Sequence, residues 1–159
     1  RVIQGELLGF DSWLIPFADI KFTDPHAMAF QHIGVTGLLK VKTVKNEAVY
    51  EMQFDTAGTI SSEELRIPMK EFYSRSQIWF ADKKIEQLSI EDAISLFMFT
   101  AARGNELRPE IEKAWKTSFK FNTTFDFKRP ITRREFAVLA DAYLKPFNLK
   151  VDLNGKLGS

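Results

Sequence analysis

The 159-residue sequence contains no cysteine and only two histidines. Without cysteine the chain can form neither disulfide bonds nor thiolate metal sites. The histidines, His26 and His32, are six residues apart, whereas two zinc ligands on one helix are typically four apart. We therefore expect both histidines to lie on the surface or at helix ends, and we predict no metal site.

Long apolar runs and an excess of one charge are also missing. No run approaches the roughly 20 apolar residues of a membrane span, and the first residues lack a signal-peptide pattern. The 22 basic and 21 acidic residues give a net charge of +1, and basic residues gather only in short groups such as Lys128-Arg129. Because nucleic-acid binding usually needs a concentrated basic face, we expect neither a nucleic-acid partner nor a membrane span.

Apolar side chains, in contrast, are plentiful. The sequence is 45% hydrophobic and includes 15 phenylalanines, enough for one compact domain with a buried core. A surplus of aromatic side chains also favours contact with a neighbouring domain. Since the chain begins at Arg1 rather than at methionine, we interpret it as part of a longer protein.

The apolar periodicity predicts a mainly α fold, a helical module of about four to five helices with an inserted β-hairpin. We treat the chain as a single accessory module. Its predicted parts are an extended lead-in (1–23), a first helical unit (24–103) with the hairpin near 39–54, a second helical unit (104–147) and a tail (148–159).

The first unit opens with a helix-start signal at Asp24-Pro25, an N-cap followed by proline at the first helical position. Gly34 and Gly37 lie on the apolar face of this predicted helix, which indicates close approach to another backbone. From Leu39 the period changes to alternation, and Lys45-Asn46-Glu47 is expected to form the turn of the hairpin.

Three later helix starts share one pattern, a serine or threonine followed three residues on by an acid, with apolar residues on both sides. This pattern is typical of a capping box, in which the hydroxyl and the carboxylate each accept a backbone N–H. The three pairs are Ser61 with Glu64, Ser89 with Asp92, and Thr132 with Glu135. The last two predict helices from Ile90 to about Arg103 and from Arg133 to about Leu144, whereas Pro68 should limit the first helix to one turn.

Pro109 is expected to open a further helix, which continues through Trp115 to Ser118. From Phe119 to Lys128 the aromatic residues alternate loosely. This segment is either a short strand or an extended arm that packs its aromatic side chains onto the core.

No residue constellation predicts an active site, so we assign no catalytic residue. Glycine-rich phosphate loops and the G-x-S-x-G elbow are absent from the sequence. The carboxylate pairs Glu63-Glu64 and Glu91-Asp92 fit first helical turns, where the helix dipole favours acids. A glycoside hydrolase would need opposed carboxylates across a cleft. Asp152-Leu153-Asn154-Gly155 has the opening of a calcium loop but lacks its closing glutamate, so we predict a tail turn.

Two arginines in the third capping box need a separate explanation. Capping requires Thr132 and Glu135, but it does not require Arg133 and Arg134, and positive charge is unfavourable in a first helical turn. Solvent, an acid of the same chain, a carboxylate of another domain or an anionic ligand could each balance this charge.

Several of these segments resemble the S-layer-homology repeat. They are Phe17-Ala18-Asp19-Ile20, the helix end Thr36-Gly37-Leu38, Trp79 to Ile85 followed by Ser89 to Phe99, and Ile131-Thr132-Arg133-Arg134-Glu135-Phe136. More narrowly, Gly9 to Leu38 together with Ile131 to Leu153 resembles the C-terminal region of Bacteroidetes FAD-dependent oxidoreductases. The first unit departs from the repeat, because Glu91-Asp92 stands where T-R-x-E is expected.

The resemblance implies an extracytoplasmic protein whose upstream domain binds FAD, while this chain itself carries no cofactor. It also implies that Arg133 binds an acidic cell-envelope polysaccharide. We expect a non-catalytic accessory module that interacts with the upstream domain of the same polypeptide. The alternatives are a module that binds envelope glycan and a fragment of a glycoside hydrolase.

Overall fold

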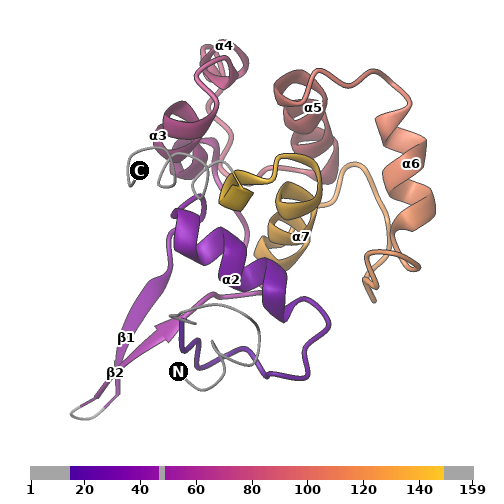
Figure 1. The fold of residues 1–159 in the computed structure, drawn as a ribbon. Helices are drawn as coiled ribbons and strands as arrows, with labels where there is room; N and C mark the ends of the chain where they lie inside the picture. The colour runs from indigo at the N-terminus through magenta and orange to yellow at the C-terminus, as the bar shows by residue number, and fades with distance from the viewer. Residues whose placement is uncertain (1–14, 47–48, 149–159) are drawn as a thin grey trace, which may run out of the picture.

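The structure is a computed structural model and describes residues 15–46 and 49–148. Its elements are shown in Figure 1: α2 (Ala27–Thr36), β1 (Lys42–Asn46), β2 (Val49–Gln53), α3 (Ser62–Phe72), α4 (Ser76–Phe80), α5 (Ile90–Thr100), α6 (Leu107–Ala114) and α7 (Arg133–Tyr143). The prediction of a mainly α fold with an inserted hairpin is therefore confirmed.

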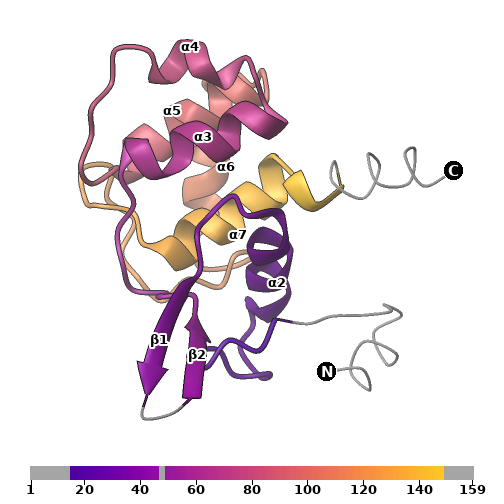
Figure 2. The ribbon, with the colours of Figure 1, turned by 90° about the vertical axis from the view of Figure 1, so that its left-hand side faces the viewer.

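Helix α7 lies in the middle of the molecule, with α2 on one side and α5 on the other (Figures 1 and 2). Helices α3 and α4 pack together, α6 lies outside α5, and the hairpin projects from the helical body. One core includes Ile33, Leu65, Leu96, Ile111 and Leu139, which come from five different helices. The two predicted helical units therefore share a single core.

All three predicted capping boxes are present. Ser89 Oγ accepts from the Asp92 amide at 3.0 Å, and the Asp92 carboxylate accepts from the Ser89 amide at 2.9 Å. The same reciprocal bonds start α3 and α7. Since each box satisfies two amides that the helix itself cannot, these short local signals decide where the helices begin.

The prediction that Pro68 limits the first of these helices was wrong, because α3 continues through it to Phe72. A proline inside a helix forfeits one backbone hydrogen bond. Leu65 and Met69 on the inner face of α3 are fully buried, and their burial offsets that loss. Short α4 follows at once and had no predicted counterpart.

Other boundaries also differ. Helix α2 begins at Ala27 rather than at Pro25, because Asp24 accepts from the His26 amide at 2.8 Å and forms a turn ahead of the helix. Helix α5 ends at Thr100, before the expected Arg103, and Ala102 adopts a left-handed conformation with φ 55°. Helix α6 begins at Leu107 and α7 ends at Tyr143, each within two residues of its predicted bound. Helix α6 ends at Ala114, however, before the expected Ser118.

The strands of the hairpin are shorter than predicted. Lys45 and Asn46, which were expected in the turn, belong to β1 and pair with Tyr50 and Val49, while Glu47 lies outside the described residues. The segment from Phe119 to Lys128 forms no strand and is an extended arm. Trp115 anchors the arm by donating from Nε1 to the Thr123 carbonyl at 2.8 Å.

Within the described ranges, no helix combines the length and apolar character needed to cross a bilayer.

The two glycines of α2 have different roles. A Cβ at Gly34 would lie 2.8 Å from the Phe17 ring, which confirms a close approach, although to side chains of the preceding segment rather than to backbone. Gly37 has open space around it and ends the helix with φ 76°, so close approach was the wrong explanation there.

Gly34→Ala should therefore destabilise the protein even though alanine favours helix. Overpacking costs about 1–3 kcal/mol, and it opposes a helix-propensity gain of about 1 kcal/mol. In urea denaturation, Gly34→Ala should have a lower free energy of unfolding than Gly37→Asn, because asparagine tolerates the left-handed conformation of position 37. A stability gain in Gly34→Ala would contradict the packing of Phe17 on α2.

Candidate binding site at the start of helix α7

The first turn of α7 carries the motif that sequence analysis identified as a ligand-binding candidate. Its backbone amides are already occupied. The Arg133 amide donates to the Gly58 carbonyl at 2.8 Å, and the Arg134 amide donates to the Thr56 carbonyl at 3.0 Å. The Glu135 amide donates to Thr132 Oγ1 at 3.1 Å. This helix start therefore does not present free N–H groups to an anion.

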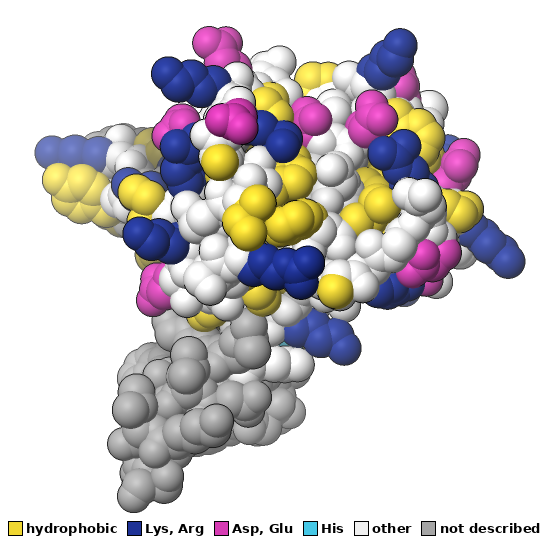
Figure 3. Space-filling view, turned by 90° about the horizontal axis from the view of Figure 1, so that it is seen from above, with side chains coloured by type: hydrophobic (Ala, Val, Ile, Leu, Met, Phe, Trp, Pro, Cys, Tyr) yellow, Lys and Arg dark blue, Asp and Glu magenta, His cyan; other side chains and the backbone are white. Residues whose placement is uncertain are grey.

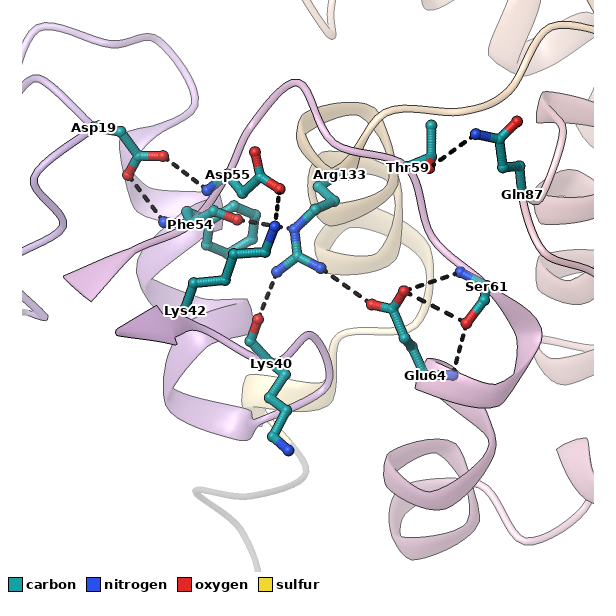
Figure 4. Close-up of polar contacts among 10 residues, drawn as sticks. All are labelled: Asp19, Lys40, Lys42, Phe54, Asp55, Thr59, Ser61, Glu64, Gln87 and Arg133. Atoms are coloured by element: carbon teal, nitrogen blue, oxygen red, sulfur yellow. Dashed lines mark hydrogen bonds and ion pairs between the residues drawn. The ribbon is translucent and has the colours of Figure 1, made fainter. Parts of the chain in front are cut away.

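Arg133 is buried, with 2% of its surface exposed. Its guanidinium donates from Nε to the Phe54 carbonyl at 2.9 Å and from Nη2 to the Lys40 carbonyl at 2.6 Å (Figure 4). It also pairs through Nη1 with Glu64 Oε2 at 3.4 Å and lies over the Phe54 ring. Burial lowers the pKa of Arg133, while the charge of Glu64 opposes this effect.

These contacts join three separate parts of the chain. Lys40 and Phe54 flank the two strands of the hairpin, and Glu64 lies in the first turn of α3. Glu64 therefore serves both the capping box with Ser61 and the buried arginine. An anionic polymer cannot reach this guanidinium in the described structure, which speaks against the ligand role that the resemblance implies for Arg133.

Arg134 points to a different partner. Its guanidinium forms two hydrogen bonds of 2.8 Å with the two carboxylate oxygens of Asp24, and Nη1 also lies 2.8 Å from Nδ1 of His26. Because arginine only donates, His26 Nδ1 accepts, and Nε2 donates to the Phe119 carbonyl at 2.6 Å. The hydrogen bonds from Arg134 hold the pKa of Asp24 below its ordinary value.

Glu135 completes the motif and is 1% exposed. Its carboxylate accepts two hydrogen bonds from the Arg129 guanidinium, at 3.1 and 2.9 Å, and one from the Thr132 amide at 3.0 Å. The Thr123 hydroxyl donates to it as well. A buried carboxylate with four donors is well satisfied, so Glu135 fastens the arm to α7.

Thr132 to Glu135 thus form an internal junction. The sequence predicted the capping pair but not Asp24 and Arg129, the oppositely charged partners of Arg134 and Glu135. Arg129 belongs to the basic group noted above, six residues before the acid that it binds. Asp24 was interpreted as a helix cap, and nothing local indicated a partner more than a hundred residues away.

The remaining candidates also have structural partners. His32 Nδ1 lies 3.0 Å from the Asp141 carboxylate and its ring stacks on Phe147 at 4.3 Å, which ties α2 to the end of α7. Asp92 caps α5, and Glu91 lies 3.5 Å from Arg108. Among the described residues, no group of three or more acidic or histidine side chains is placed to hold a metal ion. Asp152 and Asn154 lie outside the described residues.

No family model, curated protein or solved structure matches the chain. The resemblance to the S-layer-homology repeat and to the oxidoreductase C-terminal region therefore stays a prediction.

Replacing Arg133 by methionine should destabilise the fold strongly. The substitution keeps the length and apolar stem of the side chain but leaves the Phe54 and Lys40 carbonyls without their donor. Each buried acceptor left unsatisfied costs about 1–3 kcal/mol, so the free energy of unfolding should fall by at least about 2 kcal/mol in urea denaturation. Arg103→Met is the control, because Arg103 pairs with Glu106 and Glu110 on the surface, and it should change stability little. If both substitutions lowered the free energy of unfolding by the same amount, the buried role of Arg133 would be contradicted.

Asp24→Asn should destabilise the protein in a pH-dependent way. At pH 7 it removes the ion pair with Arg134, and we expect a loss of about 1.5–3 kcal/mol, typical of hydrogen bonds to charged groups. The pKa of Asp24 is lower in the folded than in the unfolded state. The ion pair therefore contributes fully to the free energy of unfolding above the unfolded-state pKa of about 3.9, and this contribution disappears as the pH falls through the folded-state pKa. The stability difference between the two proteins should narrow below about pH 4. A difference that stays constant down to about pH 2 would contradict the pairing.

Proposed function

We propose that this chain is a non-catalytic interaction module that packs on a neighbouring domain through helices α3 and α4. The observation that carries the proposal is the exposure of two large apolar side chains on these helices. Ile67 of α3 is 77% exposed and Ile78 of α4 is 69% exposed. Both isoleucines lie on helices whose other faces are buried, so a partner would bury them without reordering the backbone.

The two isoleucines lie on helices that are hydrogen-bonded to each other. Gln77 donates to the Arg66 carbonyl at 3.0 Å, and Ile67 and Ile78 directly follow these two residues. The Arg66 guanidinium in turn donates to the Phe80 carbonyl at 3.4 Å and to the Lys83 carbonyl at 3.1 Å, which fastens α3 to the end of α4 and to the turn that follows it. Seen from the α4 side, hydrophobic side chains gather in the middle of the face and charged side chains surround them (Figure 3).

Arg75 adds a second kind of contact to this surface. Its guanidinium lies 5.0 Å from the centre of the Phe99 ring of α5, and the arginine is exposed. An apolar centre with a charged rim is the usual anatomy of a protein interface, and arginine is enriched among the residues that contribute most to binding. We call the surface formed by Ile67, Ile78 and the Arg75–Phe99 pair the α3–α4 face.

The identity of the neighbour comes from the resemblance alone. It names the upstream, FAD-binding domain of an extracytoplasmic oxidoreductase as the partner, with the cofactor held by that domain. The proposal that the present chain is not itself catalytic is supported by the internal use of Arg133, Arg134 and Glu135, the polar residues that attracted attention in the sequence.

Binding of envelope glycan through Arg133 has less support, because the exposed surface of this arginine is almost nil and its donors serve backbone carbonyls. The hypothesis of a glycoside hydrolase fragment has little support as well, because the Glu64 and Asp92 carboxylates form the capping boxes of α3 and α5.

Co-expression with the protein segment encoded directly upstream tests the proposal. The unmodified chain should co-purify with that segment and with its flavin absorbance, and the double variant Ile67→Asp, Ile78→Asp should lose the association. Phe22→Asp is the matched control, because Phe22 is as exposed as Ile67 but lies ahead of α2. Both variants should unfold at nearly the unmodified chain's denaturant midpoint, since exposed apolar side chains contribute little to stability. An upstream segment that fails to bind, or a double variant that still binds, would refute the proposal.

A further inference from the structure

A second outward-facing feature is the edge of the hairpin, which is independent of the α3–α4 face. The two strands differ in their surroundings. The outer edge of strand β2 is covered by the segment ahead of α2. The Ala18 amide donates to the Met52 carbonyl at 2.8 Å, next to a bridge between Phe17 and Met52. Asp19 extends this cover by accepting from the Phe54 and Asp55 amides at 2.9 and 2.7 Å.

Strand β1 has no such cover in the part of the chain that the structure describes. Its sheet has two strands, and β1 lies on the opposite side of β2 from the segment of Phe17 and Ala18, in a hairpin that projects from the helical body (Figures 1 and 2). In an antiparallel pair, alternate residues of an edge strand turn their N–H and C=O groups outward. The outer edge of β1 therefore presents a row of backbone donors and acceptors that a further strand can use.

The hairpin is held in place before any partner arrives. Arg133 binds the carbonyls of Lys40 and Phe54, which lie just before β1 and just after β2 (Figure 4). Lys42 of β1 pairs with Asp55 across the base at 2.6 Å. A strand that is already ordered adds a partner without the entropy loss of folding itself.

The side chains of this edge decide which partner fits. Between Leu39 and Asn46 there are three lysines and no acid. Lys42 is paired with Asp55, whereas Lys40 and Lys45 are exposed and form no ion pair with the residues that the structure describes. Lys45 Nζ lies 5.8 Å from the centre of the Tyr50 ring, and Val44 is 38% exposed. Lysines on an edge strand discourage a second copy of the same strand, because like charges would face each other. The same lysines favour a strand that carries acids.

We infer that the outer edge of β1 accepts an extended, acidic segment of another protein as a third strand. Backbone hydrogen bonds to the β1 edge supply affinity. Lys45 lies on the sheet face opposite to Val44, so its exposed ammonium group selects for carboxylates on that face. Lys40, two residues ahead of β1, adds positive charge where the strand begins. The exposed apolar side chain of Val44 lies beside apolar residues that alternate with the acids.

Nuclear magnetic resonance of the whole ¹⁵N-labelled chain tests this inference with two synthetic peptides. One alternates glutamate with valine, and the other, of equal length, alternates lysine with valine. The glutamate peptide should shift the amide signals of β1 while leaving those of α3 and α4 in place, and several-fold weaker binding is expected when salt rises from about 0.05 to 0.5 M. Identical shifts with both peptides, shifts confined to the helices, or no shifts would overturn the inference.

Charge reversal provides the matched variants. Lys40→Glu with Lys45→Glu should lose binding of the glutamate peptide and gain binding of the lysine peptide. Lys113→Glu with Lys116→Glu makes the same change in net charge on exposed residues at the end of α6 and should keep the original preference. If the first variant loses its hairpin signals, the inference is tested by the unmodified chain alone. Its binding of the glutamate peptide must then weaken as salt rises. Sedimentation that reveals dimers formed through β1 would identify a second copy as the occupant and refute the heterologous partner.

Discussion

A buried guanidinium must find acceptors inside the protein, because leaving a charged donor group unsatisfied away from water is very unfavourable. In this fold Arg133 meets that demand with the carbonyls of Lys40 and Phe54 and with the carboxylate of Glu64. The hairpin can therefore project from a helical body and still be fixed at its base. The position of α3 depends on the same group, since Glu64 belongs to its first turn.

The neighbours of Arg133 extend this constraint to the rest of the chain. Arg134 fastens the segment ahead of α2 through Asp24, and Glu135 fastens the aromatic arm through Arg129. One turn of α7 thus organises segments that lie far apart in the sequence. A motif that suggested a surface binding site is an internal junction, and the surfaces that we propose for partners are the α3–α4 face and the edge of β1.

Local signals allowed much of the fold to be predicted. The capping boxes at Ser61, Ser89 and Thr132 and the alternation of the hairpin depend on residues within a few positions of one another, so their structures follow from local chemistry. The partners of Arg133 could not be predicted, because every residue offers a carbonyl and only the fold brings two of them to one arginine. Continuation of α3 through Pro68 likewise depends on tertiary burial, which outweighs local propensity.

We conclude that Arg133, at the start of α7, is not accessible to an anionic ligand. The Arg133 Nε–H resonance in a ¹⁵N spectrum tests it most directly, because a guanidinium proton exchanges slowly only when it is buried and bonded. We expect a slowly exchanging signal that does not move when polygalacturonic acid, a polymer of uronic acids, is added. A rapidly exchanging signal, or one that shifts as the polymer is titrated, would contradict the claim and restore Arg133 as a binding residue.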